Sequence, residues 1–93
     1  MINSKYRVVA TGIGVLAPNG IGKDAFWNAT LNGISGIKEL TMIDPSPYPS
    51  KIAGEIRGFE PSDYLDFKLV KRTGRAVHLG MAATKLALDD AGI

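Results

Sequence analysis

Four basic side chains lie close together in the second half of the sequence, and their types suit the binding of a charged partner. The set is Lys68, Lys71, Arg72 and Arg75. Their spacing of i, i+3, i+4 and i+7 places them on one side of a helix, if the segment is helical. Such a positive patch attracts an acidic partner by charge complementarity. The same charges could pair locally with Asp63 and Asp66, so the residues alone leave docking and local pairing open.

The glycine-rich stretch near the start fits a dinucleotide-binding pattern only formally. Gly12–Ala17 matches G-x-G-x-x-A and follows an apolar run. A pyrophosphate site also needs a helix that opens at those glycines, but Pro18 falls where its first turns should continue. We therefore expect a tight turn inside a core at this position, and no cofactor.

The side chains that commonly carry catalysis are sparse. His78 is the only histidine and no cysteine is present, and a general base or metal ligand needs partners that no spacing shows. We expect His78 to be a solvated or interface residue on the polar face of a helix. The carboxylates show no paired spacing and are expected at the surface: Glu55, Glu60, Asp63, Asp66, Asp89 and Asp90. The sequence thus predicts no catalytic, cofactor-binding or metal-binding residue in this segment.

Composition excludes some classes of protein. The formal net charge of +2 is too small to imply nucleic acid or a membrane as a partner. No apolar run approaches membrane-spanning length. Met1–Lys5 does not resemble a secretory signal, and the absence of cysteine excludes a disulfide framework. We expect a cytoplasmic setting.

Two strands are predicted, and they cannot complete a sheet. Val8–Ala10 is an unbroken apolar run, which is typical of a strand buried on both faces. Lys51–Ile56 alternates polar and apolar side chains well enough for a short strand. Because a parallel sheet needs more strands than these, the others must come from sequence beyond Ile93 or from another chain. The segment is expected to be an incomplete α/β unit and not an independent domain.

The remaining elements are helices and loops. Ala17–Gly22 is expected to be a loop, and a helix should start near Lys23 and stop at Asn32. Ile34–Ser50 should be irregular and partly extended, because three alternating prolines restrict its backbone. Pro61–Asp66 is expected to form a short helix with proline near its first position.

The strongest helical pattern runs from about Lys71 to Asp90. Small and apolar residues form one broad face: Ala76, Leu79, Gly80, Ala83, Leu86 and Ala87. Small side chains let two backbones approach each other, so we expect a close backbone neighbour at this face. The same is expected at Gly12 and Gly14, which lack a Cβ.

Several motifs together resemble the amino-terminal part of a β-ketoacyl-acyl-carrier-protein synthase. They run in order through the sequence: Arg7–Gly14 with Pro18 and Gly20, Phe26-Trp27, Gly33–Ile37, Ala53-Gly54 and Ala87–Ile93. The similarity covers essentially all 93 residues, which makes it more specific than any single motif. It implies a thiolase-like fold of the α/β class with layers in the order αβαβα, of which this chain holds the amino-terminal part.

The resemblance also implies a function for the complete protein, in fatty-acid or polyketide synthesis. In the family a cysteine takes an acyl group from a thioester, malonyl-acyl-carrier protein loses carbon dioxide and attacks it, and two histidines stabilise the developing charge. Those residues belong to later sequence, so the 93-residue segment alone is expected to be inactive. Lys68, Lys71 and Arg72 align with basic residues that resemble a docking site for the acyl carrier protein.

The partners that the resemblance implies are the acyl carrier protein, the remainder of the synthase chain and a second subunit, in a homodimer or a ketosynthase-like heterodimer. Some family members lack the nucleophilic cysteine and act as a chain-length-factor partner or a decarboxylase, and this alternative stays open. Another alternative is an independent binding module for nucleic acid or an acidic protein, although only Phe67 lies beside a residue of the basic cluster. Thr73-Gly74 replaces a common Met-Asp, which points to a specialised polyketide or secondary-metabolite branch.

Overall fold

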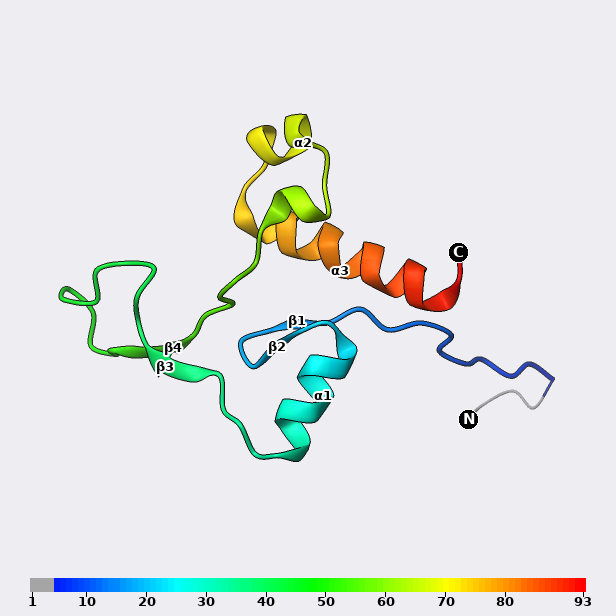
Figure 1. Cartoon of the computed structure of the whole chain (residues 1–93), viewed down its shortest axis with the longest axis horizontal. Helices are drawn as coiled ribbons and strands as arrows, with labels where there is room; N and C mark the ends of the chain where they lie inside the picture. Colours follow the sequence, from blue (N-terminus) through cyan, green and yellow to red (C-terminus); the bar gives the residue numbers. More distant parts are fainter. Residues whose placement is uncertain (1–4) are drawn as a thin grey trace.

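The computed structural model describes residues 5–93 as short elements joined by long connections (Figure 1). The elements in order are β1 (Leu16–Ala17), β2 (Gly20–Ile21), α1 (Lys23–Leu31), β3 (Ile37–Glu39), β4 (Ile52–Gly54), η1 (Pro61–Asp63), α2 (Phe67–Arg72) and α3 (Arg75–Ala91). The molecule is elongated, with extents of 56 × 37 × 26 Å. Both sheets in this part of the chain have two strands, β1 with β2 and β3 with β4. A larger sheet is therefore not formed by these residues alone.

Residues 6–15 form an extended segment without a strand partner in the described chain. Val8 is 94% exposed and Val9 is 68% exposed, and neither makes a backbone hydrogen bond within residues 5–93. The expected burial of this run on both faces is thus not provided by the described residues. The run stays open to further strands, as the prediction of an incomplete sheet requires.

β1 and β2 form a hairpin where the sequence predicts a loop. Leu16 pairs with Ile21 in antiparallel register, and Pro18 and Asn19 make the turn between the strands. The Asn19 side-chain amide donates to the carbonyl of Ile34 at 3.3 Å. The loop prediction was wrong for the flanking residues because strands of two residues have no hydrophobic periodicity, although proline and asparagine do mark the turn.

α1 confirms the predicted helix. It begins after Gly22, whose φ of 91° favours glycine, and Asp24 in its first turn suits the positive end of the helix dipole. It ends before Asn32, as expected. Ala29 is buried, whereas Trp27 is 57% exposed. One narrow face of α1 packs within the described chain and most of its apolar surface stays open.

β3 and β4 form an antiparallel ribbon in which Ile37 pairs with Gly54. The strand predicted within Lys51–Ile56 is confirmed as β4, while its partner β3 lies in a stretch expected to be irregular. The connection between the two strands has a fixed shape because the Lys51 ammonium donates to three backbone carbonyls: Pro45 at 2.8 Å, Ser46 at 3.2 Å and Tyr48 at 2.6 Å.

η1 confirms the predicted short helix, although it ends at Asp63. Pro61 occupies its first position, where a missing amide proton costs nothing. The Glu60 carboxylate accepts from the backbone N–H of Ser62 at 3.3 Å and from its hydroxyl at 2.9 Å. Glu60 therefore caps η1 and fixes the entry of the chain into the region of α2.

The helix predicted from about Lys71 to Asp90 is interrupted after Arg72, where α2 ends, and most of it is formed by α3. Thr73 (φ −126°, ψ 160°) and Gly74 (φ −91°, ψ 177°) have extended backbones. The Thr73 hydroxyl turns back to donate to the carbonyl of Leu69 at 2.6 Å, which ends α2. α3 starts at Arg75 and ends at Ala91, and it is capped by Gly92, whose φ of 80° is left-handed. The two helices therefore point in different directions (Figure 1).

The extended amino-terminal segment runs alongside α3 in the opposite direction and at very short range (Figure 1). A Cβ added at Gly14 would lie 2.0 Å from the carbonyl oxygen of Ala83, and one at Gly12 would lie 2.3 Å from that of Ala87. The Cβ added at Gly12 would also lie 2.8 Å from the Cβ of Ala91. These contacts confirm the close backbone packing predicted for both the glycines and the small-residue face.

The buried core of the described residues is small. Ala29 and Ala82 are the only buried hydrophobic residues among residues 5–93, and no large side chain in this range is fully buried. Large apolar side chains remain exposed, including Met42 at 49% and Ile93 at 84%. Such surfaces are suited to burial against further protein.

Candidate functional site

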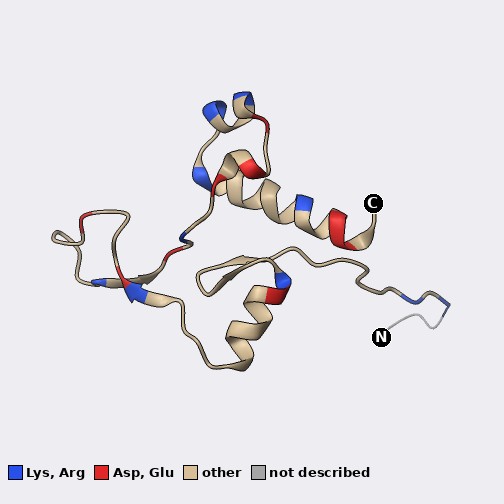
Figure 2. Ribbon diagram, viewed as in Figure 1, with Lys and Arg blue, Asp and Glu red and all other residues tan. Residues whose placement is uncertain are grey.

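Three of the four clustered basic residues lie on α2. We call Lys68, Lys71 and Arg72 the basic segment, and all three side chains are exposed. α2 lies at an edge of the molecule beside η1 and the start of α3. Figure 2 shows its basic residues there, away from the two strand pairs. The basic segment is therefore accessible in the described chain.

Arg75 does not belong to this patch, contrary to the expectation of one continuous helix. Its guanidinium donates to the carbonyl of Ile56 at 2.7 Å, and its Cζ lies 5.7 Å from the ring centroid of Phe59. The extended backbone at Thr73 and Gly74 breaks the helical relationship that would have aligned it with the others. Arg75 links the start of α3 to the chain that precedes η1.

The basic segment has no acidic partner within the described chain. The ion pairs in residues 5–93 are Lys23 with Asp90, Arg57 with Glu55, and Lys85 with Asp89. Asp63 and Asp66, the neighbours expected to compete, make no ion pair in this range. The local-pairing alternative is therefore not the arrangement found, and the three charges remain available to an external partner.

An exposed aromatic ring accompanies these charges. Phe67 opens α2 and is 62% exposed. The Lys71 ammonium lies 4.7 Å from its ring centroid, within the range of a cation–π contact. The surface of α2 thus combines positive charge with an apolar ring, so a complementary partner would offer carboxylates and an apolar side chain.

Two side chains satisfy carbonyls at the end of α2. The last four carbonyls of a helix lack partners inside it. The Thr73 hydroxyl donates to Leu69, and Nε2 of His78 lies 3.1 Å from the carbonyl oxygen of Val70. A carbonyl only accepts, so Nε2 carries the proton. His78 is only 9% exposed, and the expectation of a solvated histidine was wrong because its partner is a backbone group that no spacing reveals.

Glu55 is a buried carboxylate, not the surface charge that the sequence predicts. It is 8% exposed and accepts from the backbone N–H of Thr41 at 3.0 Å and of Met42 at 2.8 Å. The Arg57 guanidinium donates to it at 2.9 Å. The pKa of Glu55 is lowered, first by the Met42 amide and then by the Thr41 and Arg57 donors, against the opposing effect of desolvation. This carboxylate therefore anchors the loop that follows β3.

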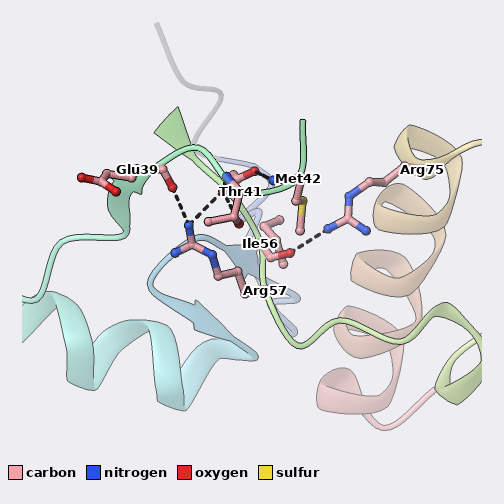
Figure 3. A network of polar contacts seen from close by, with 7 residues as sticks. Glu39, Thr41, Met42, Ile56, Arg57 and Arg75 are labelled. Carbon is pink, nitrogen blue, oxygen red and sulfur yellow. Dashed lines mark hydrogen bonds and ion pairs between the residues drawn. The ribbon is translucent and has the colours of Figure 1, made fainter. Parts of the chain in front are cut away.

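Two arginines extend this network toward α3 (Figure 3). Arg57 also donates to the carbonyl of Glu39 at 2.9 Å, so it joins the end of β3 to the chain that follows β4. Arg75 donates to the carbonyl of Ile56, which is the residue before Arg57 in the chain. The network links the ribbon to the helix that begins after the basic segment. No sequence pattern indicated these contacts, because most of the acceptors are backbone atoms.

Asp90 is a second carboxylate with a structural role that the sequence did not indicate. It accepts from the backbone N–H of Ile13 at 3.0 Å and forms an ion pair with Lys23. The pKa of Asp90 is lowered mainly by the hydrogen bond from Lys23, and the pKa of Lys23 is raised by the same contact. Asp90 thus joins the end of α3 to the amino-terminal segment and to the start of α1.

Other chemistry finds little support in the described chain. The glycines of the dinucleotide-like pattern pack against α3, and they lead into a strand pair instead of the helix that a pyrophosphate site needs.

A mainly apolar cavity of about 250 Å³ is lined by Ile13, Val15, Lys23, Phe26 and Trp27. Within residues 5–93, no group of histidine and carboxylate side chains is arranged to hold a metal ion. In the same range no helix is long and apolar enough to cross a membrane.

Residues 5–93 match the sequence profile of the family described as Beta-ketoacyl synthase, N-terminal domain. The chain belongs to the beta-ketoacyl synthase family. The family predicted from the motifs is thereby confirmed, and every helix and strand described above falls within the matched range of this synthase chain.

Relatives of the synthase chain include a polyketide synthase subunit and a 3-oxoacyl-[acyl-carrier-protein] synthase. It is 41% identical over 86 residues to the Tetracenomycin polyketide synthase ketoacyl synthase beta subunit of Streptomyces glaucescens, covering 92% of this chain and 21% of that protein. It is 40% identical over 89 residues to 3-oxoacyl-[acyl-carrier-protein] synthase 2 of Coxiella burnetii, and the match covers 96% of this chain and 22% of that protein. The chain spans about a fifth of the length of these relatives.

The synthase chain also matches part of a solved structure, The ishigamide ketosynthase/chain length factor. The match has a TM-score of 0.84 at 32% sequence identity and covers 91% of this chain and 21% of that one. The described residues thus form the amino-terminal part of a thiolase-like α/β fold, as the motif resemblance implied.

Proposed function

We propose that this chain is the amino-terminal part of a β-ketoacyl-acyl-carrier-protein synthase. The complete protein would condense an acyl thioester with malonyl-acyl-carrier protein, with loss of carbon dioxide, in fatty-acid or polyketide synthesis. The family match and the two relatives support this proposal. The observation that carries it to specific residues is the exposed basic segment on α2, which has no acidic partner within the described chain.

We propose that the 93-residue segment does not catalyse this reaction alone. The condensation needs a nucleophile to hold the acyl group and donors to stabilise the charge that develops on oxygen. The sequence holds no cysteine, and its one histidine is buried against the carbonyl of Val70. The segment contributes structure and a docking surface, and the reacting groups come from the rest of the protein.

The basic segment is proposed to receive the acyl carrier protein. Exposed positive charges without internal partners raise the association rate of an acidic protein and select it over neutral ones. Lys71 and Arg72 stand in the last turn of α2, where the negative end of the helix dipole favours cations. The ring of Phe67 beside Lys71 adds an apolar contact. A carrier with carboxylates around one apolar side chain fits this surface.

The test is charge reversal in the complete protein. The variant Lys71→Glu/Arg72→Glu should weaken binding of the acyl carrier protein by about tenfold at low salt, and the difference should shrink as salt rises. A matched control is Lys38→Glu/Lys85→Glu, which changes the net charge equally on β3 and α3. Carrier affinity is measured by titration. Equal affinity for the two double variants would contradict docking at α2.

A second candidate function is a non-condensing partner subunit. Two similar proteins favour it, one described as a ketoacyl synthase beta subunit and the other as a ketosynthase/chain length factor. The two functions differ in the covalent step, because only a condensing enzyme forms an acyl thioester with its own cysteine. Intact mass spectrometry of the complete protein after exposure to an acyl thioester separates them: an acyl adduct supports condensation, and its absence supports the partner subunit.

We also propose that residues 1–93 are part of a larger domain and that the complete protein pairs with a second synthase subunit, identical or homologous. The exposed run at Val8 and Val9 and the small core support the first statement, since these surfaces need further protein to cover them. The solved ketosynthase/chain length factor supports the second. Sedimentation of the complete protein tests the pairing, and a monomer at micromolar concentration would contradict it.

A further inference from the structure

α2 is too short to keep its shape without help from its surroundings. It has six residues, and isolated helices shorter than about 12–15 residues are marginal in water. None of its residues is fully buried, and only Leu69 and Val70 are half-buried on its inner side. The geometry of the basic segment therefore depends on contacts at the ends of the helix.

The carboxyl end of α2 has two such contacts, and they come from side chains outside it. Thr73 donates to the carbonyl of Leu69 at 2.6 Å and His78 to that of Val70 at 3.1 Å. His78 belongs to the first turn of α3, where its own N–H bonds to the carbonyl of Gly74 at 3.1 Å. Its imidazole therefore bridges the first turn of α3, the longest helix of the described residues, and the last turn of α2.

We propose that His78 is a positioning residue that holds α2, and with it Lys71 and Arg72, in the orientation required for carrier docking. This inference rests on the proposed docking function of the basic segment. Without the imidazole donor the Val70 carbonyl would lose its partner and the last turn would fray. Lys71 and Arg72 occupy that turn, so a partner would have to order them on binding and would lose affinity for that reason.

The experiment compares two substitutions at one position in the complete protein. His78→Leu fills a similar volume with an apolar side chain and removes the hydrogen-bond donor. His78→Gln keeps an N–H that can reach the Val70 carbonyl. We expect His78→Leu to weaken carrier binding by about threefold to tenfold, the loss associated with one hydrogen bond. His78→Gln should stay within about twofold of the parent protein.

Two further readouts separate positioning from a general loss of structure. Hydrogen exchange should accelerate at the amides of Val70, Lys71 and Arg72 in His78→Leu and stay unchanged at Ala82 and Ala83 of α3. The salt dependence of carrier binding should keep its slope, because no charge at the docking surface has changed. Thr73→Val, which uncaps Leu69, should reproduce the local exchange and the weaker binding, and Thr73→Ser should restore both.

The outcomes distinguish this inference from the docking proposal. If Lys71→Glu/Arg72→Glu weakens carrier binding while His78→Leu does not, docking stands and the positioning role of His78 is overturned. If neither variant changes carrier affinity, docking itself fails and takes the inference with it. If both variants weaken carrier binding, the faster hydrogen exchange is confined to α2 and His78→Gln restores the affinity, then docking at α2 and the positioning role of His78 are both supported.

Discussion

Glu55 illustrates how a carboxylate can serve the fold without taking part in chemistry. Its two oxygens accept hydrogen bonds from Thr41, Met42 and Arg57, so each oxygen of the buried carboxylate has at least one donor. The bonds from backbone amides matter most, because they fix the path of the chain directly after β3. The residue behaves as an internal anchor of the β3–β4 connection.

The lowered pKa of Glu55 predicts a pH dependence of stability. A carboxylate that binds protons less readily in the folded than in the unfolded state stabilises the fold above about pH 4.5, and this stabilisation is lost as the pH falls further. Glu55→Gln should lower the melting temperature of the complete protein at pH 7 and flatten its acid dependence. Thermal melts between pH 7 and pH 3 measure both effects. The control is Glu60→Gln, because Glu60 is an exposed residue that caps η1. Equal changes in melting temperature for the two substitutions would contradict an anchoring role for Glu55.

Exposure of charged residues could be predicted at this scale, but burial of polar ones could not. Lys68, Lys71 and Arg72 are exposed as expected, because a charge without a partner avoids the interior. Glu55 was expected at the surface and His78 was expected to be a solvated or interface residue, and both are buried. Most of their partners are backbone groups, and a sequence shows side-chain types but not which carbonyl or amide will lie beside them.

At the scale of elements, contact between the amino-terminal segment and α3 depends on the lack of side chains at two glycines. A Cβ at Gly14 would overlap the carbonyl oxygen of Ala83 at 2.0 Å, and backbone cannot move aside as a flexible side chain can. Gly14→Ala should therefore destabilise the complete protein by about 3 kcal/mol. Urea denaturation gives the free energy of unfolding.

Gly74→Ala provides the matched control for this substitution. Gly74 also lies in extended backbone, with φ −91°, but nothing lies within 4 Å of its Cβ position. We expect a change within about 0.5 kcal/mol. Similar free energies of unfolding for Gly14→Ala and Gly74→Ala would contradict the close packing of the amino-terminal segment against α3.

The contacts of Asp90 give a second prediction for this packing. Asp90→Asn should loosen the attachment of α3 to Lys23 and Ile13, and hydrogen exchange at the Ile13 amide and in α1 should become faster. Asp89→Asn is the control, because the Lys85–Asp89 pair is exposed and exposed pairs contribute little. The lowered pKa of Asp90 places the loss of the wild-type contact at acid pH, below about 3.8. Identical exchange in the two variants would argue against a tether at Asp90.

Elements with several turns were predictable, and those of two or three residues were not. α1 carries its own start and stop signals at Asp24 and Asn32, and most of α3 follows a helical apolar pattern. The β1–β2 hairpin was missed because each strand is too short for a pattern. The break at Thr73 was missed because threonine and glycine are tolerated in helices, and only the hydrogen bond to Leu69 shows why the chain leaves the helix there.

At the scale of the whole molecule, the distribution of apolar side chains matches a piece of a larger fold. Val8, Val9 and Trp27 are more than half exposed, and both sheets stop at two strands within residues 5–93. The prediction of an incomplete sheet came from the fully apolar run at Val8–Ala10, which has no polar side to present to water. The family could be predicted from ordered motifs, but its missing strands and reacting groups could not be located in 93 residues.

The most direct test of this account is the unfolding of the isolated segment 1–93 compared with the complete protein. Trp27 is the only tryptophan of the segment, so its fluorescence reports the α1 region while circular dichroism follows the helices. We predict broad, non-coincident transitions for the segment, because it buries too little apolar surface to offset its conformational entropy. A sharp unfolding transition that coincides in both signals would show an independent domain and contradict the account.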